Sequence, residues 1–457
     1  MKNILASFLL LIFSLSLNAQ FTTVDSVFVK KFYEIALSNN AAHDDLKVLC
    51  KQIGNRIAGS ENANRAIVWG EKTLMGIADK VMKMPVMVPK WVREKNEYGA
   101  IVVGRRKTVI PIKALGGSIG TNGLLRAEVI ECRDFEDLKK KGDAVKGKIV
   151  FFNKAFDPVF INTGSAYGNT FPIRSDGASE AAKYGAVGCI IRSLTSADDR
   201  FPHTGAMAYK SDVPQIPAAA ISSLDAHVLH TKLQWSKVSF EMKMNCELFP
   251  DVKQYNVVGE IVGKQFPDRV ILVGGHLDSW DVGEGAHDDG AGIVQSIEVI
   301  RLLKQAGYEP ACTIRCVLFI NEEFGNDGGL TYADSVKAQH LNHIAAIESD
   351  AGGFTPKGFS LDGTDEQVEW LKGLQDFFDP YNLYVFKRGG SGVDISPLKN
   401  GSTMLFGLQV DGQRYFDYHH TDNDIFENVN RRELELGAAA MTSLVYFIDQ
   451  REMKKGE

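Results

Sequence analysis

Acidic and histidine side chains follow successive predicted strands in the C-terminal half of the chain. His276 comes directly after one apolar strand, and Glu322 and Glu323 follow the next. Asp350 follows a third strand, and His420 lies in the loop after a fourth. In open parallel sheets, ligands bind at the edge formed by the carboxyl ends of the strands. We therefore expect these five side chains, although scattered in sequence, to lie close together.

The donor atoms of this predicted cluster are nitrogen and oxygen only. Two histidines and several carboxylates, without a thiolate, suit zinc or another divalent first-row metal. Asp288 lies between the first strand and its helix, at the same edge, and its two oxygens make it the natural bridge between two ions about 3.5–4 Å apart. Asp278, two residues after His276, is placed to accept the other imidazole N–H and to fix the tautomer.

The adjacent carboxylates of Glu322 and Glu323 suggest two different roles, one as a metal ligand and one as a general base. Neighbouring residues of an extended chain point in opposite directions. One of the two can therefore bind a metal ion while the other faces the metal-bound water as a general base. Two metal ions and a free carboxylate suit hydrolysis, because the ions lower the pKa of water and polarise a carbonyl group.

Each of these motifs alone has an ordinary explanation. A single His-x-Asp is usually a surface or core pair, and Asp-Asp-Gly is a common turn. Their joint placement at strand ends in one domain favours a functional site. His287 adjoins a better ligand, Asp288, and we expect His419 only to line the site.

The elements that must position these residues alternate between strand and helix from about residue 255 onward. Apolar runs predict the strands, and a helical stripe such as Ile293, Ile297, Ile300 and Leu303 predicts a helix. The predicted strands are 270–273, 313–320, 344–347 and 403–408, and the predicted helices are 289–306, 329–340, 366–378 and 431–448. Such alternation predicts an α/β fold with a mostly parallel sheet and helices on both faces.

Two further regions precede this unit. Residues 20–113 carry helical segments around 24–50 and 62–78, followed by short strands. Residues 114–252 form a self-contained α/β pattern that lacks the acid and histidine clusters. We therefore expect one domain made of residues 20–113 and 253–457, with a second domain, residues 114–252, inserted into it.

The N-terminal segment is typical of a secretory signal peptide. MKNILASFLLLIFSLSLNAQ has one early Lys, an apolar run too short for a comfortable membrane span, and a small residue at Ala19. We expect residues 1–19 to be a signal peptide cleaved near Ala19. The mature protein is then exported, to the periplasm or the extracellular space, without a membrane span.

The overall composition excludes several classes of protein. Hydrophobic residues make up 44% and charged residues 24% of the 457 residues, which is ordinary for a globular chain and excludes a disordered or collagen-like one. The net charge of -6 argues against general nucleic-acid binding, which usually needs a basic face.

Taken together, the motifs resemble the two-zinc exopeptidases, a family that includes bacterial leucyl aminopeptidases, glutamate carboxypeptidase and the transferrin-receptor ectodomain. The matching strings are GGHLDSW (274–280), GAHDDGAG (285–292), NEEFGNDGG (321–329), ESDAGG (348–353) and YHHTDND (418–424). IGNRIAGSE (53–61) is similar to a segment near the N-terminus of the family, and the region 114–252 resembles a protease-associated domain. The likeness covers nearly the whole mature chain.

The resemblance implies two Zn²⁺ ions per subunit. The implied ligands are His276 and Asp350 on one ion, Glu323 and His420 on the other, and Asp288 between them. Glu322 is then the general base for the attack of a zinc-bound water, and the peptide bond between Asp288 and Asp289 is expected to be cis. The implied activity is that of a homodimeric exopeptidase acting on unblocked dipeptides or short peptides.

Three other functions share parts of this pattern. A non-catalytic binding protein of the transferrin-receptor type lacks parts of the metal set, which is complete here. A glutaminyl cyclase has a related fold with one zinc ion and a reduced ligand set, whereas His276 and the Asp288–Asp289 pair are present here. An aminopeptidase acting on longer peptides stays open, because the choice depends on how far the inserted domain closes over the cleft.

Overall fold

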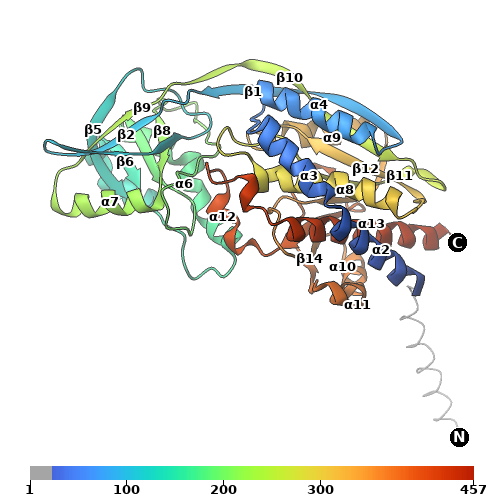
Figure 1. Cartoon of the computed structure of the whole chain (residues 1–457). Helices are drawn as coiled ribbons and strands as arrows, with labels where there is room; N and C mark the ends of the chain where they lie inside the picture. The colour runs from blue at the N-terminus through green and yellow to red at the C-terminus, as the bar shows by residue number, and fades with distance from the viewer. Residues whose placement is uncertain (1–22, 457) are drawn as a thin grey trace, which may run out of the picture.

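The computed structural model describes residues 23–456, which form two eight-stranded sheets joined by a long two-stranded ribbon (Figure 1). The expected signal peptide, residues 1–19, lies outside the described residues. Within residues 23–456, no helix is both long and apolar enough to cross a membrane.

The first sheet is mixed. Its strands, in spatial order, are β1 (Lys80–Arg93), β10 (Cys246–Ile261), β12 (Cys312–Phe319), β11 (Phe266–His276), β13 (Asn342–Glu348), β16 (Met404–Val410), β14 (Pro356–Asp362) and β15 (Val385–Arg388). The central strands β12, β11, β13 and β16 run parallel to one another, whereas β10 is antiparallel to both β1 and β12, and β14 to β16. The expectation of a mostly parallel sheet is therefore corrected. β1 and β10 carry the chain away from the first sheet and back to it, so they run in opposite directions.

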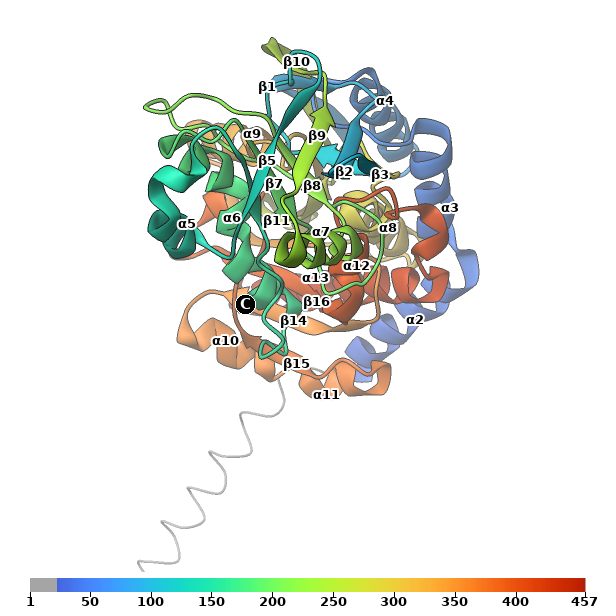
Figure 2. The same ribbon diagram turned by 90° about the vertical axis from the view of Figure 1, so that its left-hand side faces the viewer.

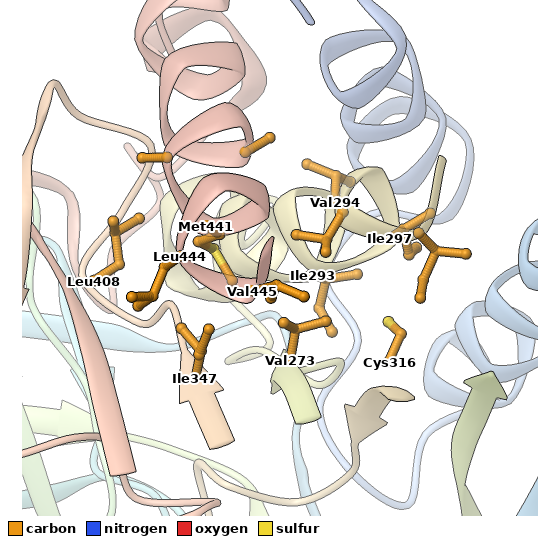
Figure 3. Close-up of a cluster of buried hydrophobic side chains, with 14 of the residues drawn as sticks. Val273, Ile293, Val294, Ile297, Cys316, Ile347, Leu408, Met441, Leu444 and Val445 are labelled. Atoms are coloured by element: carbon orange, nitrogen blue, oxygen red, sulfur yellow. The ribbon is translucent and has the colours of Figure 1, made fainter. Parts of the chain in front are cut away.

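Helices cover both faces of this sheet, as the alternation predicted. One face carries α2 (Thr23–Asn39), α3 (Ala41–Val48), α4 (Glu61–Met75), α8 (Ala291–Gln305) and α13 (Arg431–Gly456), and the other carries α9 (Asp327–Ala338). Alternate residues of the central strands face the two layers, so Val273 and Ile347 belong to one core and Leu272 and Ala346 to the other. Figure 3 shows α8 and α13 meeting over Val273 and Ile347.

The second sheet is formed by the segment between β1 and β10, residues 94–245, here called the inserted segment (Figure 2). Its strands, in spatial order, are β3 (Arg106–Ile110), β2 (Tyr98–Val103), β9 (Ser239–Lys243), β5 (Leu125–Cys132), β6 (Ile149–Phe152), β7 (Gly188–Arg192), β8 (Ala218–Ile221) and β4 (Ile112–Ala114). Its helices are α5 (Phe135–Lys141), α6 (Thr163–Lys183) and α7 (Ser223–Trp235). Because β2, β3 and most of β4 precede residue 114, this sheet begins earlier than the domain boundary expected from the sequence.

Four elements differ from the expected pattern. The helix expected at 366–378 is divided into α10 (Asp365–Lys372) and α11 (Gln375–Phe378), and α13 continues beyond the expected end at residue 448. β14 and β15 were not expected, because neither has a long apolar run. The first sheet therefore extends two strands further on its β16 side than the sequence pattern indicates.

Candidate metal centre

Four parallel strands deliver the expected side chains to one edge. β12, β11, β13 and β16 are neighbours in that order, so their carboxyl ends are continuous. β11 ends on His276, Glu322 and Glu323 follow β12, and Asp350 follows β13. His420 follows β16 and the short helix α12 (Tyr415–Tyr418). The convergence predicted from the sequence is therefore present.

Asp288 lies at the centre of this cluster, in the turn between β11 and α8, and its peptide bond to Asp289 is cis, as expected. Its Oδ1 is 3.3 Å from Nε2 of His276, and its Oδ2 is 3.2 Å from Nε2 of His420. Oδ1 of Asp350 is 3.6 Å from the same nitrogen of His276, and Oε2 of Glu323 is 2.9 Å from that of His420. Each oxygen of Asp288 thus faces its own histidine and its own second carboxylate.

These spacings match the requirements of a divalent ion. Zinc holds nitrogen and oxygen ligands at about 2.0–2.1 Å, so the ligand atoms around a tetrahedral ion lie about 3.3–3.4 Å apart. Nε2 of His276, Oδ2 of Asp288, Oε1 of Glu323 and Oδ1 of Asp350 are buried without a hydrogen-bond partner. Buried polar atoms rarely stay unpaired, so these atoms fit a bound cation.

His419 also lies near the bridge, with Nε2 3.6 Å from Oδ2 of Asp288, and the pair could hold an ion together with His420. Its ring stacks on that of His420, with centroids 3.4 Å apart and planes inclined by 18°. The in-plane lone pairs of two stacked rings run nearly parallel and do not converge well on one ion. Glu323 is better placed, because its Oε2 lies 2.9 Å from Nε2 of His420 and its Oε1 has no hydrogen-bond partner.

Asp278 supports the site in a different way from the one expected. Nδ1 of His276 is 3.1 Å from the backbone carbonyl oxygen of Asp278, whereas the carboxylate oxygen Oδ1 is 3.9 Å away. The carboxylate instead accepts the backbone N–H groups of Glu322 and Glu323, at 3.1 and 3.3 Å. The backbone of residue 278 therefore orients the imidazole, and its side chain fixes the loop that carries the two glutamates.

Two further carboxylates were missed by the sequence reasoning. Asp424 accepts the backbone N–H groups of His287 and Asp288, at 2.7 and 3.1 Å. Asp289 accepts the backbone N–H of His276 at 3.1 Å. Both residues stand inside the quoted motifs, GAHDDGAG and YHHTDND, but nothing in their spacing distinguishes a supporting carboxylate from a metal ligand.

The inserted segment contributes directly to the cluster. The backbone of Thr204 donates its N–H to the carbonyl oxygen of His420 at 3.0 Å, and its own carbonyl oxygen is 3.2 Å from Nδ1 of His420. The buried guanidinium of Arg174 lies beside both, with Nη1 3.3 Å from Nδ1 of His420 and 3.4 Å from the Thr204 carbonyl oxygen. A donor hydrogen on Nδ1 leaves Nε2 of His420 as the metal-binding atom.

Burial and mutual attraction set the protonation of the cluster. Burial opposes ionisation of Asp288, but the imidazoles of His276 and His420 outweigh it and hold the pKa of Asp288 well below its usual range. Burial lowers the pKa of His420, but Glu323 and Asp288 raise it to about 9. Burial, reinforced by neighbouring carboxylates, raises the pKa of Glu322 well above its ordinary value. The cluster as a whole therefore attracts positive charge.

A cavity of about 390 Å³ lies beside Asp350. Its walls come from residues 162–164 of the inserted segment, from β14, β15 and β16, and from the loop that leads to α12. Tyr415 and Phe416 of α12 also line it. The site therefore combines a cation-binding cluster with a volume suited to a small ligand.

Comparisons with known proteins identify the family. The model of peptidase family M28 matches residues 256–445, which include every residue of the cluster. Carboxypeptidase Q of Xenopus laevis is 37% identical over 421 residues, covering 91% of this chain and 87% of that protein. Carboxypeptidase Q of Homo sapiens is 34% identical, with the same coverage of each chain. The chain belongs to peptidase family M28.

Membership in M28 makes the protein a metallopeptidase, as the resemblance of its motifs implied. A solved structure of a peptidase M28 precursor from Shewanella amazonensis SB2B has a TM-score of 0.89 and 32% identity, covering 93% of this chain and 97% of that one. A zinc aminopeptidase from Bacillus subtilis shares the fold, with a TM-score of 0.64 and 19% identity, covering 89% of this chain and 94% of that one. The family resemblance drawn from the motifs is therefore confirmed.

Proposed function

We propose that this M28 peptidase is a zinc-dependent exopeptidase that hydrolyses unblocked dipeptides or short peptides. The observation that carries the proposal is the position of Asp288, which presents one oxygen to each of two imidazoles at 3.2–3.3 Å. This spacing supports two zinc ions per subunit with Asp288 between them. When bound, such ions lower the pKa of water, polarise the scissile carbonyl and stabilise negative charge on its oxygen.

The donor set divides into two groups around this bridge. His276 and Asp350 would hold one ion, and Glu323 and His420 the other. The distances of 3.6 Å and 2.9 Å within these two groups support the division. All these residues except the partly exposed Asp350 are buried, which keeps bulk water from competing with them.

Glu322 is proposed as the general base and then the general acid. Its place beside the cluster and its raised pKa, caused by burial, support a carboxyl group that can both accept and donate a proton. The Glu322 carboxylate accepts a proton from the attacking water and delivers it to the nitrogen of the leaving amine. The Asp278 carboxylate accepts the backbone N–H of Glu322 at 3.1 Å, and this bond fixes the backbone from which the Glu322 side chain extends.

The remaining features of the proposal concern organisation and location. Residues 1–19 are proposed to be a signal peptide cleaved near Ala19, with export of the mature protein as a homodimer. Because β2, β3 and β4 belong to the second sheet, residues 94–245, in place of the expected 114–252, are proposed as a protease-associated insertion, and residues 20–93 and 246–457 as the peptidase domain. N-terminal sequencing of the secreted chain and light scattering test the cleavage site and the dimer.

A substrate panel tests the activity. The zinc-loaded protein receives unblocked dipeptides, their N-acetylated forms and longer peptides, while elemental analysis counts the metal. We expect two zinc ions per subunit and cleavage of the unblocked dipeptides alone. Cleavage of acetylated substrates with release of the C-terminal residue would contradict the proposal. Stepwise release of N-terminal residues from long peptides would support an aminopeptidase instead.

A further inference from the structure

The cavity beside Asp350 has an uneven balance of charge. The charged side chains that line it are Asp350, Asp411, Lys357 and Lys387. Nζ of Lys357 forms an ion pair with Oδ2 of Asp411 at 2.8 Å, and Asp350 belongs to the candidate metal centre. Lys387, on β15, is exposed and pairs with no carboxylate among the described residues. Lys387 is therefore the uncompensated charge of this cavity.

The neighbouring cation on the same strand shows the contrast. Arg388 forms an ion pair with Asp365 at 2.5 Å and donates to the carbonyl oxygen of Gly363 at 2.5 Å. It does not line the cavity. On β15, the residue facing away from the cavity is thus neutralised within the protein, whereas the cavity-lining Lys387 keeps its charge available.

We propose that Lys387 binds a substrate carboxylate on the C-terminal side of the scissile bond. This inference rests on the proposed exopeptidase function and names the substrate end that this cavity takes. A lysine ammonium and a carboxylate form a charge-assisted hydrogen bond, which is stronger than a neutral one. The preferred source of the carboxylate is the free C-terminus of a dipeptide, because the cavity adjoins the metal centre directly at Asp350.

The sign of the uncompensated charge distinguishes the two ends of a peptide. A cavity that received the N-terminal ammonium would need an unpaired carboxylate, because a cation beside Lys387 would be repelled. Of the two carboxylates that line this cavity, Asp411 is paired with Lys357, and Asp350 is a proposed metal ligand, so neither is available to an ammonium. The residue released with a free carboxylate therefore occupies this cavity.

Kinetics with three substrates test the proposal. Alanyl-leucine, alanyl-leucinamide and alanyl-glutamate α-amide share a free amine and differ in the carboxylate. With Lys387→Met, we expect kcat/KM for alanyl-leucine to fall about tenfold, mainly through KM, with alanyl-leucinamide unchanged. Lys387→Arg keeps the charge and most of the activity. Lys337→Met, which removes a lysine from the exposed face of α9, is the matched control and leaves all three substrates unaffected.

The pattern of effects decides between the sources of the carboxylate. A loss confined to alanyl-leucine supports recognition of the terminal carboxylate, and a loss confined to the glutamate amide supports recognition of a side-chain carboxylate. An equal loss with all three substrates, or no loss with any, would overturn the role of Lys387.

A binding measurement separates this inference from the proposed activity. Calorimetry on zinc-loaded Glu322→Gln compares alanyl-leucine with its amide, with and without Lys387→Met. We expect the free acid to bind about tenfold more tightly than the amide, and Lys387→Met to abolish that difference. If the wild type hydrolyses no dipeptide, the proposed function fails. The difference in Kd between the free acid and the amide still decides whether Lys387 binds a carboxylate.

Discussion

Arg56 offers a sharp test of how the loop between His276 and Asp288 is held in place. Its guanidinium is fully buried and donates through Nε to the carbonyl oxygen of Leu277 at 2.6 Å. Nη1 and Nη2 donate to the carbonyl oxygens of Glu284 and Gly285, at 2.8 and 2.9 Å. These three carbonyl groups belong to the chain between His276 and the bridge, so one side chain from the IGNRIAGSE motif secures the whole connection.

The expected cost of Arg56→Met follows from these contacts. Each carbonyl left without its donor costs about 1–3 kcal/mol, and the release of a buried cation offsets part of the total. We expect a net loss of about 4 kcal/mol in the free energy of unfolding. At about 2.1 cal/mol/K per residue, the unfolding entropy of a chain of this size is about 0.9 kcal/mol/K, which corresponds to a decrease in Tm of about 4–5 °C.

Thermal unfolding and zinc competition against a chromophoric chelator measure the effect. Because the secured loop joins two proposed zinc ligands, Arg56→Met should also weaken zinc binding at least tenfold. The stability and zinc affinity of Arg56→Lys should lie between those of the wild type and Arg56→Met, since one ammonium cannot reach three carbonyl groups. Arg65→Met is the control, because Arg65 is exposed although it also donates to a carbonyl oxygen, that of Gln52. If Arg56→Met loses no more stability and zinc affinity than Arg65→Met, the reasoning is refuted.

Three further predictions address the chemistry, the inserted segment and the pH dependence of stability. Glu322→Gln should retain both metal ions but lower kcat at least 100-fold, and a loss of metal by elemental analysis would show instead that Glu322 is a ligand. Nη1 of Arg174 donates to the Thr204 carbonyl oxygen that orients His420, so Arg174→Met should speed zinc loss to a chelator about tenfold and Arg174→Lys should speed it less; identical rates in all three proteins would show that the guanidinium does not support His420. Burial raises the pKa of Glu435 to about 8, so the folded state retains a proton that the unfolded chain has already lost, and stability falls as the pH rises from about 4.5 to 8. Glu435→Gln should remove up to about 5 kcal/mol of this decline in urea titrations, and parallel pH profiles of variant and wild type would contradict it.

Much of the first sheet could be predicted because its central strands are short apolar runs that end in polar motifs. The strand predicted at Thr313–Ile320 illustrates this, since the strand observed, β12, spans Cys312–Phe319 and ends three residues before Glu322. The antiparallel edges could not be predicted in this way. β14 and β15 have mixed composition, and their pairing with the sheet depends on partners distant in sequence.

The candidate site shows the same division. The sequence indicated five candidate donors, because each ends or follows a strand of the parallel part of the sheet, at the edge where the loops after these strands converge. It did not indicate that Asp278 would use its backbone for His276 and its carboxylate for the glutamate loop. These alternatives differ by small rotations of the side chain, which tertiary packing decides and the spacing of residues in the sequence does not indicate.

By itself, the sequence determined the candidate donors and their order along the strands, and its motifs carried the resemblance that implied a metallopeptidase. Only the tertiary structure decided which oxygen of Asp288 faces which imidazole, and that Thr204 and Arg174 of the inserted segment complete the surroundings of His420. The physical reason is the range of the contacts. Strand periodicity is a local property of neighbouring residues, whereas Thr204 and His420 are 216 positions apart and meet only when the two sheets pack together.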